Sequence, residues 1–249
     1  MLEMVRGQTK EESLEIDETL PPRRPIVLAI TGASGVIYGL RLMQVLLHRG
    51  RGIELLITPA ARDVLRHELG LELNLDDFDP ASLGPWVSCS EMPEPWGRGS
   101  GEVVSLGYGK TSFSGKIGRL RYWRFDDLNA PLASGSVLTD GMVICPCSLA
   151  TLAAIVHGIS DNLIRRAAEV HLKERRRLIV VPRETPLSAI QLRNLYFAAR
   201  HGVTVLPAMP GFYHRPSSLG EMVDFVVARI CDHLGEDFQL VEPWGSECE

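Results

Sequence analysis

Residues Ile26–Gly35 read I-V-L-A-I-T-G-A-S-G and decide the fold of this 249-residue chain. The first five residues are a continuous apolar run, which is typical of a strand buried on both faces. The next five form a loop of small residues, and apolar side chains with helical spacing follow in Val36–His48. A buried strand, a glycine loop and a helix in this order predict the first unit of an α/β sheet.

The same alternation returns along most of the chain. The further predicted strands are Ile53–Ile57, Gly141–Cys145, Leu178–Val181 and Val203–Leu206. The further predicted helices are Pro59–Leu69, Ser148–His157, Asp161–Arg175, Pro186–Arg200 and Pro216–Leu234. Apolar strands that alternate with helices predict an α/β fold with a single Rossmann-like or flavodoxin-like parallel sheet. Helices cover both faces of such a sheet, which gives three αβα layers.

Two segments depart from this rhythm. Met1–Arg24 is polar and acidic and contains Pro21-Pro22, so we expect a disordered tail over residues 1–24 and one domain over residues 25–249. Asn74–Asn129 is rich in Gly, Pro and Ser, with a short possible strand at Leu120–Phe125. We expect an excursion inserted before the core resumes, at about residues 74–129, with a hairpin as one form that it can take.

Composition argues against several classes of function. A net charge of −5 and a pI near 5.8 disfavour nucleic-acid binding, which needs an excess of Lys and Arg on one face. No apolar run approaches the roughly 20 residues of a membrane span, and the charged Met1–Leu20 is unlike a secretory leader. The five cysteines include no C-x-x-C pair. We therefore expect a cytoplasmic protein with neither nucleic acid nor membrane as a partner.

The loop Thr31–Gly35 is the first element with chemical potential. Backbone N–H groups at a helix N-terminus form an anion site, and Ser34 adds a hydroxyl donor. Gly39 comes too late to complete G-x-G-x-x-G, so the dinucleotide fingerprint is a poor match. Phosphate binding and a plain tight turn both remain open for this loop.

Residues 145–148 read C-P-C-S where a predicted strand ends and a helix begins. Ser148 is well placed as an N-cap, which would explain it without any ligand. Neither cysteine has a neighbouring His, which disfavours a cysteine nucleophile. The acidic run Asp76–Asp79 lacks D-D-x-x-D spacing, so we expect no magnesium or other metal site.

Two charged loops follow predicted strands. Pro182–Pro186 reads P-R-E-T-P, and Gly211–Pro216 reads G-F-Y-H-R-P. They place Arg183, Glu184 and Tyr213 at the carboxyl ends of parallel strands, where open α/β sheets bind ligands. Together with the glycine loop, these residues predict a site for two phosphorylated molecules.

One predicted helix carries charges on a common face. Arg166 and Lys173 are seven residues apart, and Glu169 lies between them. A solvated, salt-bridged helix explains this spacing, and contact with an anionic ligand is the alternative. Arg229 has a similar double interpretation, because Asp232 lies three residues on and can pair with it across a helix turn.

Taken together, these motifs resemble the UbiX family of flavin prenyltransferases. The matching segments are I-T-G-A-S-G-V-I-Y-G-L-R-L, C-S-L-A-T-L, R-A-A-E-V-H-L-K-E-R-R, V-P-R-E-T-P-L and G-F-Y-H-R-P, within about Ile26–Leu69 and Leu132–Trp244. Such proteins join a dimethylallyl group from dimethylallyl phosphate to reduced FMN, and the prenylated FMN serves a UbiD-type decarboxylase. The resemblance therefore implies an FMN-binding domain, a metal-independent transferase and a homo-oligomer, with a dodecamer as the expected assembly.

The resemblance also assigns roles to individual residues. The residues implied to bind FMN are Gly32, Ala33, Ser34, Thr58, Ser148, Thr151, Arg166 and Arg183. Those implied to bind the donor are Lys173, Arg183, Tyr213, Arg229 and Trp244. Those implied to take part in catalysis are Glu68, Glu184, Lys173 and Arg183.

Two other functions remain open. An FMN-dependent decarboxylase of the cysteine-decarboxylase type would share the fold but would need a His near the first helix, and His48 lies at the wrong end of it. A non-catalytic flavin-carrying accessory subunit of an aromatic-acid decarboxylase would keep the glycine loop. It would have no need for Lys173, Arg183, Glu184 and Arg229 together.

Overall fold

The computed structural model describes residues 23–88, 117–237 and 240–241. Its centre is one six-stranded sheet with the strand order β3-β2-β1-β4-β5-β6, in which every neighbouring pair is parallel. The strands are β1 (Ile26–Ile30), β2 (Ile53–Ile57), β3 (Leu120–Arg124), β4 (Gly141–Cys147), β5 (Leu178–Pro182) and β6 (Thr204–Val205). The predicted parallel α/β sheet is confirmed.

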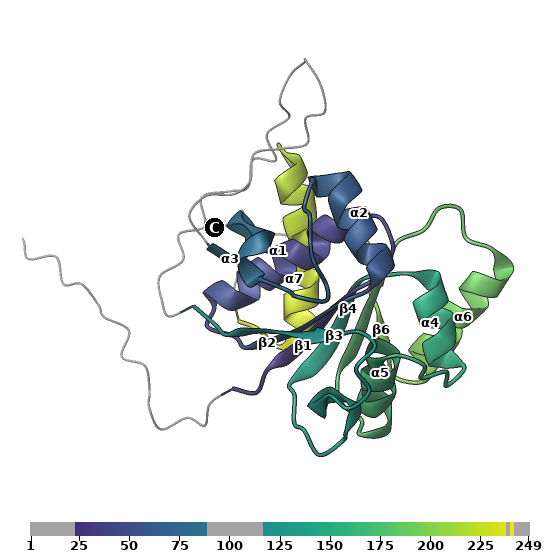
Figure 1. Ribbon diagram of the computed structural model, residues 1–249. Coiled ribbons are helices and arrows are strands. Elements are labelled where there is room, and N and C mark those ends of the chain that lie inside the picture. Colours follow the sequence, from purple (N-terminus) through teal and green to yellow (C-terminus); the bar gives the residue numbers. More distant parts are fainter. Residues whose placement is uncertain (1–22, 89–116, 238–239, 242–249) are drawn as a thin grey trace, which may run out of the picture.

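Helices cover both faces of the sheet and complete the three layers (Figure 1). One face packs against α1 (Val36–His48), α2 (Pro59–Leu69), α3 (Pro85–Ser88) and α7 (Leu219–Leu234). The other packs against α4 (Leu149–Val156), α5 (Leu163–Lys173) and α6 (Ala189–Arg200). Two short 3-10 turns, η1 (Pro80–Leu83) and η2 (Pro131–Ala133), lie in the connections.

The central strands are apolar throughout because both of their faces are buried. In β1, Ile26, Leu28 and Ile30 belong to the core under α1 and α7, whereas Val27 and Ala29 belong to the core under α4 and α5. All five side chains are fully shielded from solvent. Strands of a parallel sheet alternate between two hydrophobic layers, so no polar position interrupts the run.

The strand order reverses between β1 and β4. From β1 the chain moves outward to β2 and β3, then returns to β4 on the other side of β1 and continues to β5 and β6. The loops that leave β1 and β4 therefore diverge to opposite faces of the sheet. This reversal point, at the carboxyl ends of the strands, is where open α/β sheets hold their ligands.

The predicted excursion is integrated into the sheet more closely than expected. The Leu120–Phe125 run forms β3, which pairs with β2 in parallel from Ile53↔Leu120 to Ile57↔Arg124. A hairpin was one form expected for this segment from its sequence, but β3 is instead an edge strand of the main sheet. Its Tyr122 ring stacks on Phe78 at 4.2 Å between centroids, which anchors the preceding segment. Residues 89–116 of the excursion, and the predicted tail apart from residues 23–24, lie outside the described part of the chain.

Several helices begin later than the sequence pattern indicated, and their caps explain the difference. We expected α6 to start at Pro186, but Ser188 caps it by accepting a hydrogen bond from Gln191 N at 3.3 Å. The Gln191 side chain accepts from Ser188 N at 2.7 Å, which completes a capping box. Ser218 caps α7 in a similar way, through Glu221 N at 3.2 Å.

A glycine lets the first helix pack tightly on the sheet. A Cβ atom added at Gly39 would lie 2.2 Å from the carbonyl oxygen of Cys145 in β4. We expect Gly39→Ala to lower the free energy of unfolding by about 2 kcal/mol or more, because the backbone clash outweighs the roughly 1 kcal/mol that alanine adds to helix stability. Urea unfolding measures this difference.

Gly52→Ala is the matched control for this substitution. The nearest atom to a Cβ at Gly52 is 3.6 Å away, an ordinary van der Waals contact. Its unfolding free energy should differ from that of the wild type by less than about 0.5 kcal/mol. Equal stability of the Gly39→Ala and Gly52→Ala variants would contradict the close approach of α1 to β4.

Candidate active site at the strand-order reversal

A single threonine joins the two loops that diverge at the reversal point. The Thr31 hydroxyl donates to the carbonyl oxygen of Pro146 at 2.8 Å and accepts from the backbone N–H of Ser148 at 2.7 Å. The Thr31 backbone N–H also donates to the Pro146 carbonyl, at 3.2 Å. Because Thr31 is fully buried, these bonds hold the end of β1 against the end of β4 and fix the floor of the site.

The N-terminus of α1 is occupied by a carboxylate of the same chain. The backbone N–H groups of Gly35 and Val36 donate to Glu68 of α2 at 2.9–3.2 Å. These groups belong to the helix end that the sequence suggested for a phosphate. Gly35 adopts the left-handed conformation, with φ at 93°, which turns its N–H toward Glu68. A flavin phosphate would therefore find the remaining part of the loop, Gly32–Ser34, rather than these two donors.

Gly32 is exposed, Ala33 is 9% exposed and Ser34 is half-buried. A Cβ atom at Gly32 would lie 2.5 Å from Ala60 Cβ, so the loop packs directly on the first turn of α2. Thr58 caps that turn by accepting from Ala61 N at 3.1 Å. The glycine loop and the N-terminus of α2 thus form one continuous surface.

The loop after β4 supplies a second helix N-terminus. Ser148 accepts from Thr151 N at 3.3 Å, and the two hydroxyls are 2.9 Å apart, with Ser148 as donor. The predicted N-cap role of Ser148 is confirmed. Both side chains lie beside the Thr31 bridge, so the N-terminal ends of α2 and α4 flank the reversal point with their positive dipole ends.

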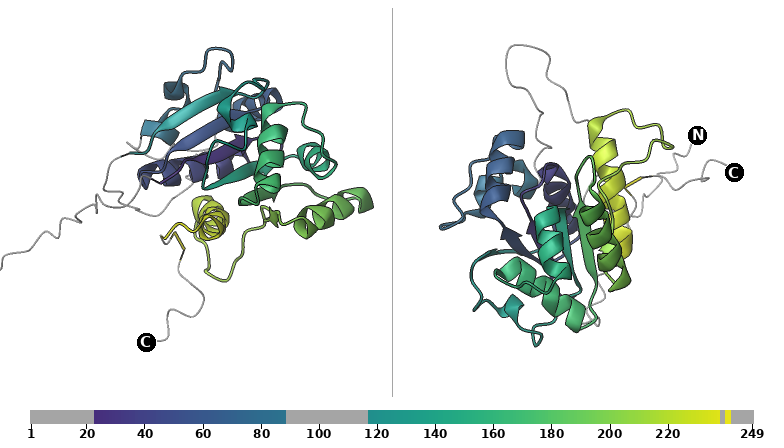
Figure 2. Two further views of the ribbon diagram at one scale, coloured as in Figure 1. Left: turned by 90° about the horizontal axis from the view of Figure 1, so that it is seen from below. Right: turned by 90° about the vertical axis from the view of Figure 1, so that its right-hand side faces the viewer.

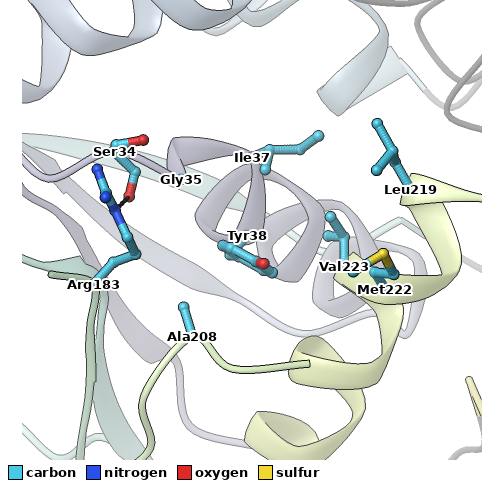
Figure 3. A pocket seen from close by; sticks show the side chains of 9 residues that line it. All are labelled: Ser34, Gly35, Ile37, Tyr38, Arg183, Ala208, Leu219, Met222 and Val223. Carbon is cyan, nitrogen blue, oxygen red and sulfur yellow. Dashed lines mark hydrogen bonds between the residues drawn. The ribbon is translucent and has the colours of Figure 1, made fainter. Parts of the chain in front are cut away.

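A cavity of about 280 Å³ opens next to the glycine loop. Figure 3 shows Ser34 and Arg183 side by side at one end of it, with Gly35 beside them. The walls away from this polar end are apolar, and they comprise Ile37, Tyr38, Ala208, Leu219, Met222 and Val223. The cavity therefore has a cationic head and a hydrophobic body.

The geometry of Arg183 orients its charge toward the glycine loop. Its Nε atom donates to the Ser34 carbonyl oxygen at 3.3 Å, and the rest of the side chain is exposed. The adjacent Glu184 is exposed and accepts from Thr185 N at 3.1 Å. Arg183 and Glu184 thus make separate hydrogen bonds, each in reach of solvent or a ligand.

The phenol of Tyr38 lines the same cavity. Burial raises the pKa of Tyr38, Cys145 adds to the increase, and the Arg183 guanidinium opposes it. The hydroxyl is accordingly protonated at neutral pH and can act as a hydrogen-bond donor. Tyr38 comes from α1, so the first helix contributes a side chain to the site in addition to its N-terminus.

The loop Gly211–Pro216 packs against α7 through a cluster of aromatic rings. His214 stacks on Phe225 at 5.4 Å between centroids, with an interplanar angle of 6°. Tyr213 meets the Phe225 ring edge-on at 5.6 Å. Close packing below this loop leaves no room for a side chain at Gly211, where a Cβ would be 2.9 Å from the Phe225 ring. Tyr213 itself is 47% exposed and belongs to the same edge of the sheet as Arg183.

The charged face of α5 forms the ion pairs expected of a solvated helix. Arg166 pairs with Glu169 at 2.9 Å, and its Nε donates to the Ala133 carbonyl at 3.1 Å. Ser160 donates to Glu169 at 2.5 Å, and the pKa of Glu169 is lowered by this hydrogen bond and by Arg166. Arg166 is held in place from two sides, at the start of the helix.

Two of the cations implied to bind the donor lie away from Arg183. Lys173 is the last residue of α5, near the amino ends of the strands, and pairs with Glu174. Arg183 follows β5 at the opposite edge, and a five-residue strand separates these edges by about 15 Å. Arg229 lies in the second half of α7 and pairs with Asp232 at 2.7 Å. One chain therefore does not bring Lys173 and Arg183 together, and Trp244 lies outside the described residues.

The cysteines beside the reversal point are unreactive. Cys145 and Cys147 are fully buried. Burial raises the pKa of Cys147 to about 12 and that of Cys145 further still. Thiols in this state are protonated at neutral pH, which agrees with the sequence-based argument against a cysteine nucleophile.

Two further features are absent among the described residues. No group of three or more His, Cys, Asp or Glu side chains there could hold a metal ion. None of the described helices has both the length and the apolar character of a membrane span.

Comparisons with known proteins identify the family of this chain. A family model described as Flavoprotein matches residues 14–231. A flavin prenyltransferase UbiX of Halalkalibacterium halodurans is 41% identical over 220 residues, covering 88% of this chain and 93% of that protein. The enzyme of the same name from Pseudomonas aeruginosa is 41% identical over 222 residues, or 89% of this chain and 94% of its own. The chain belongs to the flavin prenyltransferase UbiX family.

Solved structures of similar proteins share the fold. The crystal structure of AnUbiX (PadA1) in complex with FMN and dimethylallyl pyrophosphate has a TM-score of 0.69 and 32% identity, covering 89% of this chain and 97% of that one. A dodecameric FMN-dependent UbiX-like decarboxylase from Escherichia coli O157:H7 has a TM-score of 0.68 and 30% identity, covering 88% and 98%. These likenesses favour the UbiX family over the cysteine-decarboxylase and accessory-subunit alternatives.

Sequence reasoning missed three features of this UbiX-family site. Thr31 was seen only as part of a loop, although a buried hydroxyl between two strands is its main role. Tyr38 belongs to the matching segment I-T-G-A-S-G-V-I-Y-G-L-R-L, but only the structure shows that it lines the cavity. Leu219 and Met222 also line the cavity and belong to no motif, because their spacing is the same as that of ordinary core residues. The bond from Gly35 to Glu68 joins residues 33 positions apart, and no local pattern indicates it.

The Thr31 bridge should contribute measurably to stability. Thr31→Val keeps the side-chain shape but leaves the Ser148 N–H without its acceptor, so we expect a loss of about 1–3 kcal/mol in the free energy of unfolding. Thr204→Val, in the half-exposed strand β6, should change it by less than about 0.5 kcal/mol. Urea unfolding of both variants tests this, and equal stabilities would show that the bridge is not needed.

The buried thiols should resist alkylation in the folded protein. With pKa values raised well above 9, Cys145, Cys147 and Cys231 remain protonated and shielded at pH 8. After a short incubation with iodoacetamide, peptide mass spectrometry should find these three residues unmodified in native protein and fully modified in urea. Rapid native labelling of Cys147 would restore the possibility of a reactive cysteine.

Proposed function

We propose that this protein transfers a dimethylallyl group from a dimethylallyl phosphate ester to reduced FMN. The observation that carries the proposal is the cavity with Ser34 and Arg183 at its polar end and an apolar body beyond them. It lies beside the glycine loop that leaves the reversal point, near the carboxyl edge of the sheet, where this fold binds ligands. An anionic head and a short hydrocarbon chain on one donor molecule match these two ends.

The residues around the reversal point suit FMN. Its single phosphate is matched by the surface that Gly32–Ser34 and the N-terminus of α2 form at Thr58. On the opposite face of the sheet, the N-terminal turns of α4 and α5 carry the hydroxyls of Ser148 and Thr151 and the guanidinium of Arg166. These groups can hydrogen-bond polar groups of the flavin. Reduced FMN, when bound, supplies the electron pair for the new bond to the allylic carbon.

The chemistry requires cations near the leaving group. As the allylic C–O bond breaks, the phosphate departs with the bonding electrons, and its negative charge grows on oxygen. Arg183 stabilises this charge directly, and we assign Lys173, Tyr213 and Arg229 to the same clamp. The carboxylates of Glu68 and Glu184 would deliver a proton to the prenyl double bond and take up the proton displaced from the flavin as the second bond closes. These cations balance the charge of the leaving phosphate without a metal ion.

The position of Lys173 indicates that neighbouring chains complete the site. In one chain Lys173 and Arg183 lie at opposite edges of the sheet, so a shared clamp needs Lys173 from a second copy. A contact surface is available on α6, which projects from the body and exposes Ile190, Leu192, Tyr196 and Phe197 (Figure 2). Exposed apolar side chains in such number are typical of a subunit interface. We propose a homo-dodecamer, as in the similar protein from Escherichia coli.

The product would leave for a second enzyme. A modified flavin made at the open edge of a sheet is a soluble cofactor, and its use by a UbiD-type decarboxylase is part of the proposal.

The reaction itself is tested by mass spectrometry of the flavin. Protein incubated anaerobically with reduced FMN and dimethylallyl monophosphate or diphosphate should release FMN heavier by one C5H8 unit. Arg183→Ala should lower kcat/KM for the donor by roughly ten- to a hundredfold, because one charge-assisted contact is lost. Glu184→Gln should bind both ligands normally but slow ring closure. Unmodified FMN with both donors would refute the proposed function.

Mixed oligomers test whether the site is shared between chains. Lys173→Ala and Arg183→Ala should each keep at most about a tenth of the wild-type activity alone, because each loses one charge-assisted contact. Co-expressed with different tags, they should recover about a quarter of the wild-type activity, because that share of randomly paired sites has both wild-type residues. Arg183→Ala co-expressed with Glu184→Ala is the control, since one loop carries both residues and no intact site can form. Recovery in neither mixture would contradict a site that takes Lys173 and Arg183 from different chains.

A further inference from the structure

The walls of the cavity beyond Ser34 and Arg183 carry a hydroxyl group, that of Tyr38. Every other described residue of these walls has a side chain without nitrogen or oxygen: Ile37, Ala208, Leu219, Met222 and Val223. Tyr38 is half-buried. Figure 3 shows it between the Arg183 end of the cavity and the side chains of α7. The Tyr38 hydroxyl is therefore a polar point on an otherwise apolar surface.

The ring of Tyr38 is held in place by the glycine loop. The Tyr38 backbone N–H donates to the Gly35 carbonyl oxygen at 3.1 Å. A Cβ atom added at Gly35 would lie 3.1 Å from Cδ2 of the Tyr38 ring, so the ring lies directly on the loop backbone. Further along α1, Arg41 pairs with Asp224 of α7 at 2.7 Å, which ties together the two helices that enclose the cavity. The hydroxyl consequently has a fixed place in the cavity.

No described residue shares a hydrogen bond with the Tyr38 hydroxyl. Burial raises the pKa of Tyr38, so this group keeps its proton at neutral pH and is a hydrogen-bond donor. A polar group that is shielded from water is rarely left without a partner, because the hydrogen bond lost to water is costly. We therefore expect the acceptor to belong to a ligand of the cavity.

We propose that the Tyr38 hydroxyl donates a hydrogen bond to a phosphate oxygen of the donor. This inference rests on the proposed function and adds a neutral group to the cations assigned there. The Arg183 guanidinium is close enough to lower the pKa of Tyr38 against the effect of burial, so an anion bound by Arg183 lies near the phenol. A dimethylallyl phosphate has hydrogen-bond acceptors only at its phosphate. Tyr38 keeps its proton throughout and acts by binding the donor.

Tyr38→Phe removes the hydroxyl and keeps the ring. The probe is isopentyl monophosphate, a saturated ester that cannot ionise to an allylic cation and so binds without reacting. Calorimetric titration of the FMN-loaded protein should show its Kd raised roughly tenfold in this variant, as expected for the loss of a hydrogen bond to a charged group. The affinity for FMN should stay unchanged. So should the midpoint of urea unfolding, because no hydrogen bond within the protein is lost.

Tyr122→Phe is the matched control. The Tyr122 hydroxyl donates to the carbonyl oxygen of Leu75 at 3.1 Å, and the residue lies in β3, outside the cavity lining. This variant should lower the urea midpoint by roughly 0.3–0.5 M, because a hydrogen bond within the protein is lost. Its Kd for isopentyl monophosphate should equal that of the wild type. The two variants are thus expected to have opposite effects on stability and binding.

Three results would overturn the inference. An unchanged Kd for isopentyl monophosphate in Tyr38→Phe would show that the hydroxyl does not contact the phosphate. A fall in the urea midpoint of this variant to that of Tyr122→Phe would reveal a partner within the protein. A loss of FMN affinity with an unchanged Kd for the ester would assign the hydroxyl to the flavin.

The saturated ester also separates this inference from the proposed reaction. If the wild type prenylates no FMN, the proposed function fails, while the change in Kd for isopentyl monophosphate still decides whether Tyr38 binds a phosphate ester. If the wild type prenylates FMN but the Kd is the same in Tyr38→Phe, the proposed function stands and the role of Tyr38 fails. A wild type that does not bind the ester contradicts the inference as well.

Discussion

The hydrogen bonds of Thr31 are the constraint on which the site depends. The strand order reverses between β1 and β4, so their following loops leave in opposite directions and open a crevice. The Thr31 hydroxyl spans the crevice at its base by donating to Pro146 O and accepting from Ser148 N. Its burial makes both bonds hard to replace by water. The glycine loop and the N-terminus of α4 consequently keep a fixed separation, which a flat aromatic cofactor requires.

The second constraint is electrostatic and lies between α1 and α7. Burial raises the pKa of Asp224, while hydrogen bonding and charge from Arg41 lower it. Gln44 accepts a further bond from Arg41 at 2.8 Å. A buried ion pair contributes little net stability relative to apolar packing, but it is costly to break on one side only. Its value here is geometric, because it sets the distance between the two helices that enclose the cavity.

The cations that we propose for the donor site lie far apart within one chain. Arg183 lies at the carboxyl edge of the sheet, whereas Lys173 lies at the amino edge with Glu174 as its partner. Arg229 is engaged by Asp232. Such exposed pairs are weak, so an incoming phosphate can compete for either cation. The apolar side chains exposed on α6 supply a reason for copies of the chain to associate.

The sequence by itself determined the layers, most element boundaries and the end of the sheet that holds the site. Apolar strands such as Ile26–Ile30 and the periodic helix Val36–His48 are local patterns, and their bounds in the structure are the same as predicted. The prediction began α6 at Pro186, whereas the helix starts at Ala189 after its Ser188 cap. Arg183 and Tyr213 each follow a predicted strand. Parallel sheets bind ligands at the carboxyl edge, so these two residues were predicted to lie near a ligand site.

Tertiary structure alone decided the contacts between residues distant in sequence. The attachment of β3 to β2, the capture of the α1 N-terminus by Glu68 and the apolar wall at Leu219 and Met222 all depend on segments that folding brings together. The same is true of the separation between Lys173 and Arg183, which the motif order could not reveal. A local pattern records which face of a helix or strand is buried, but it carries no record of the partner that covers that face.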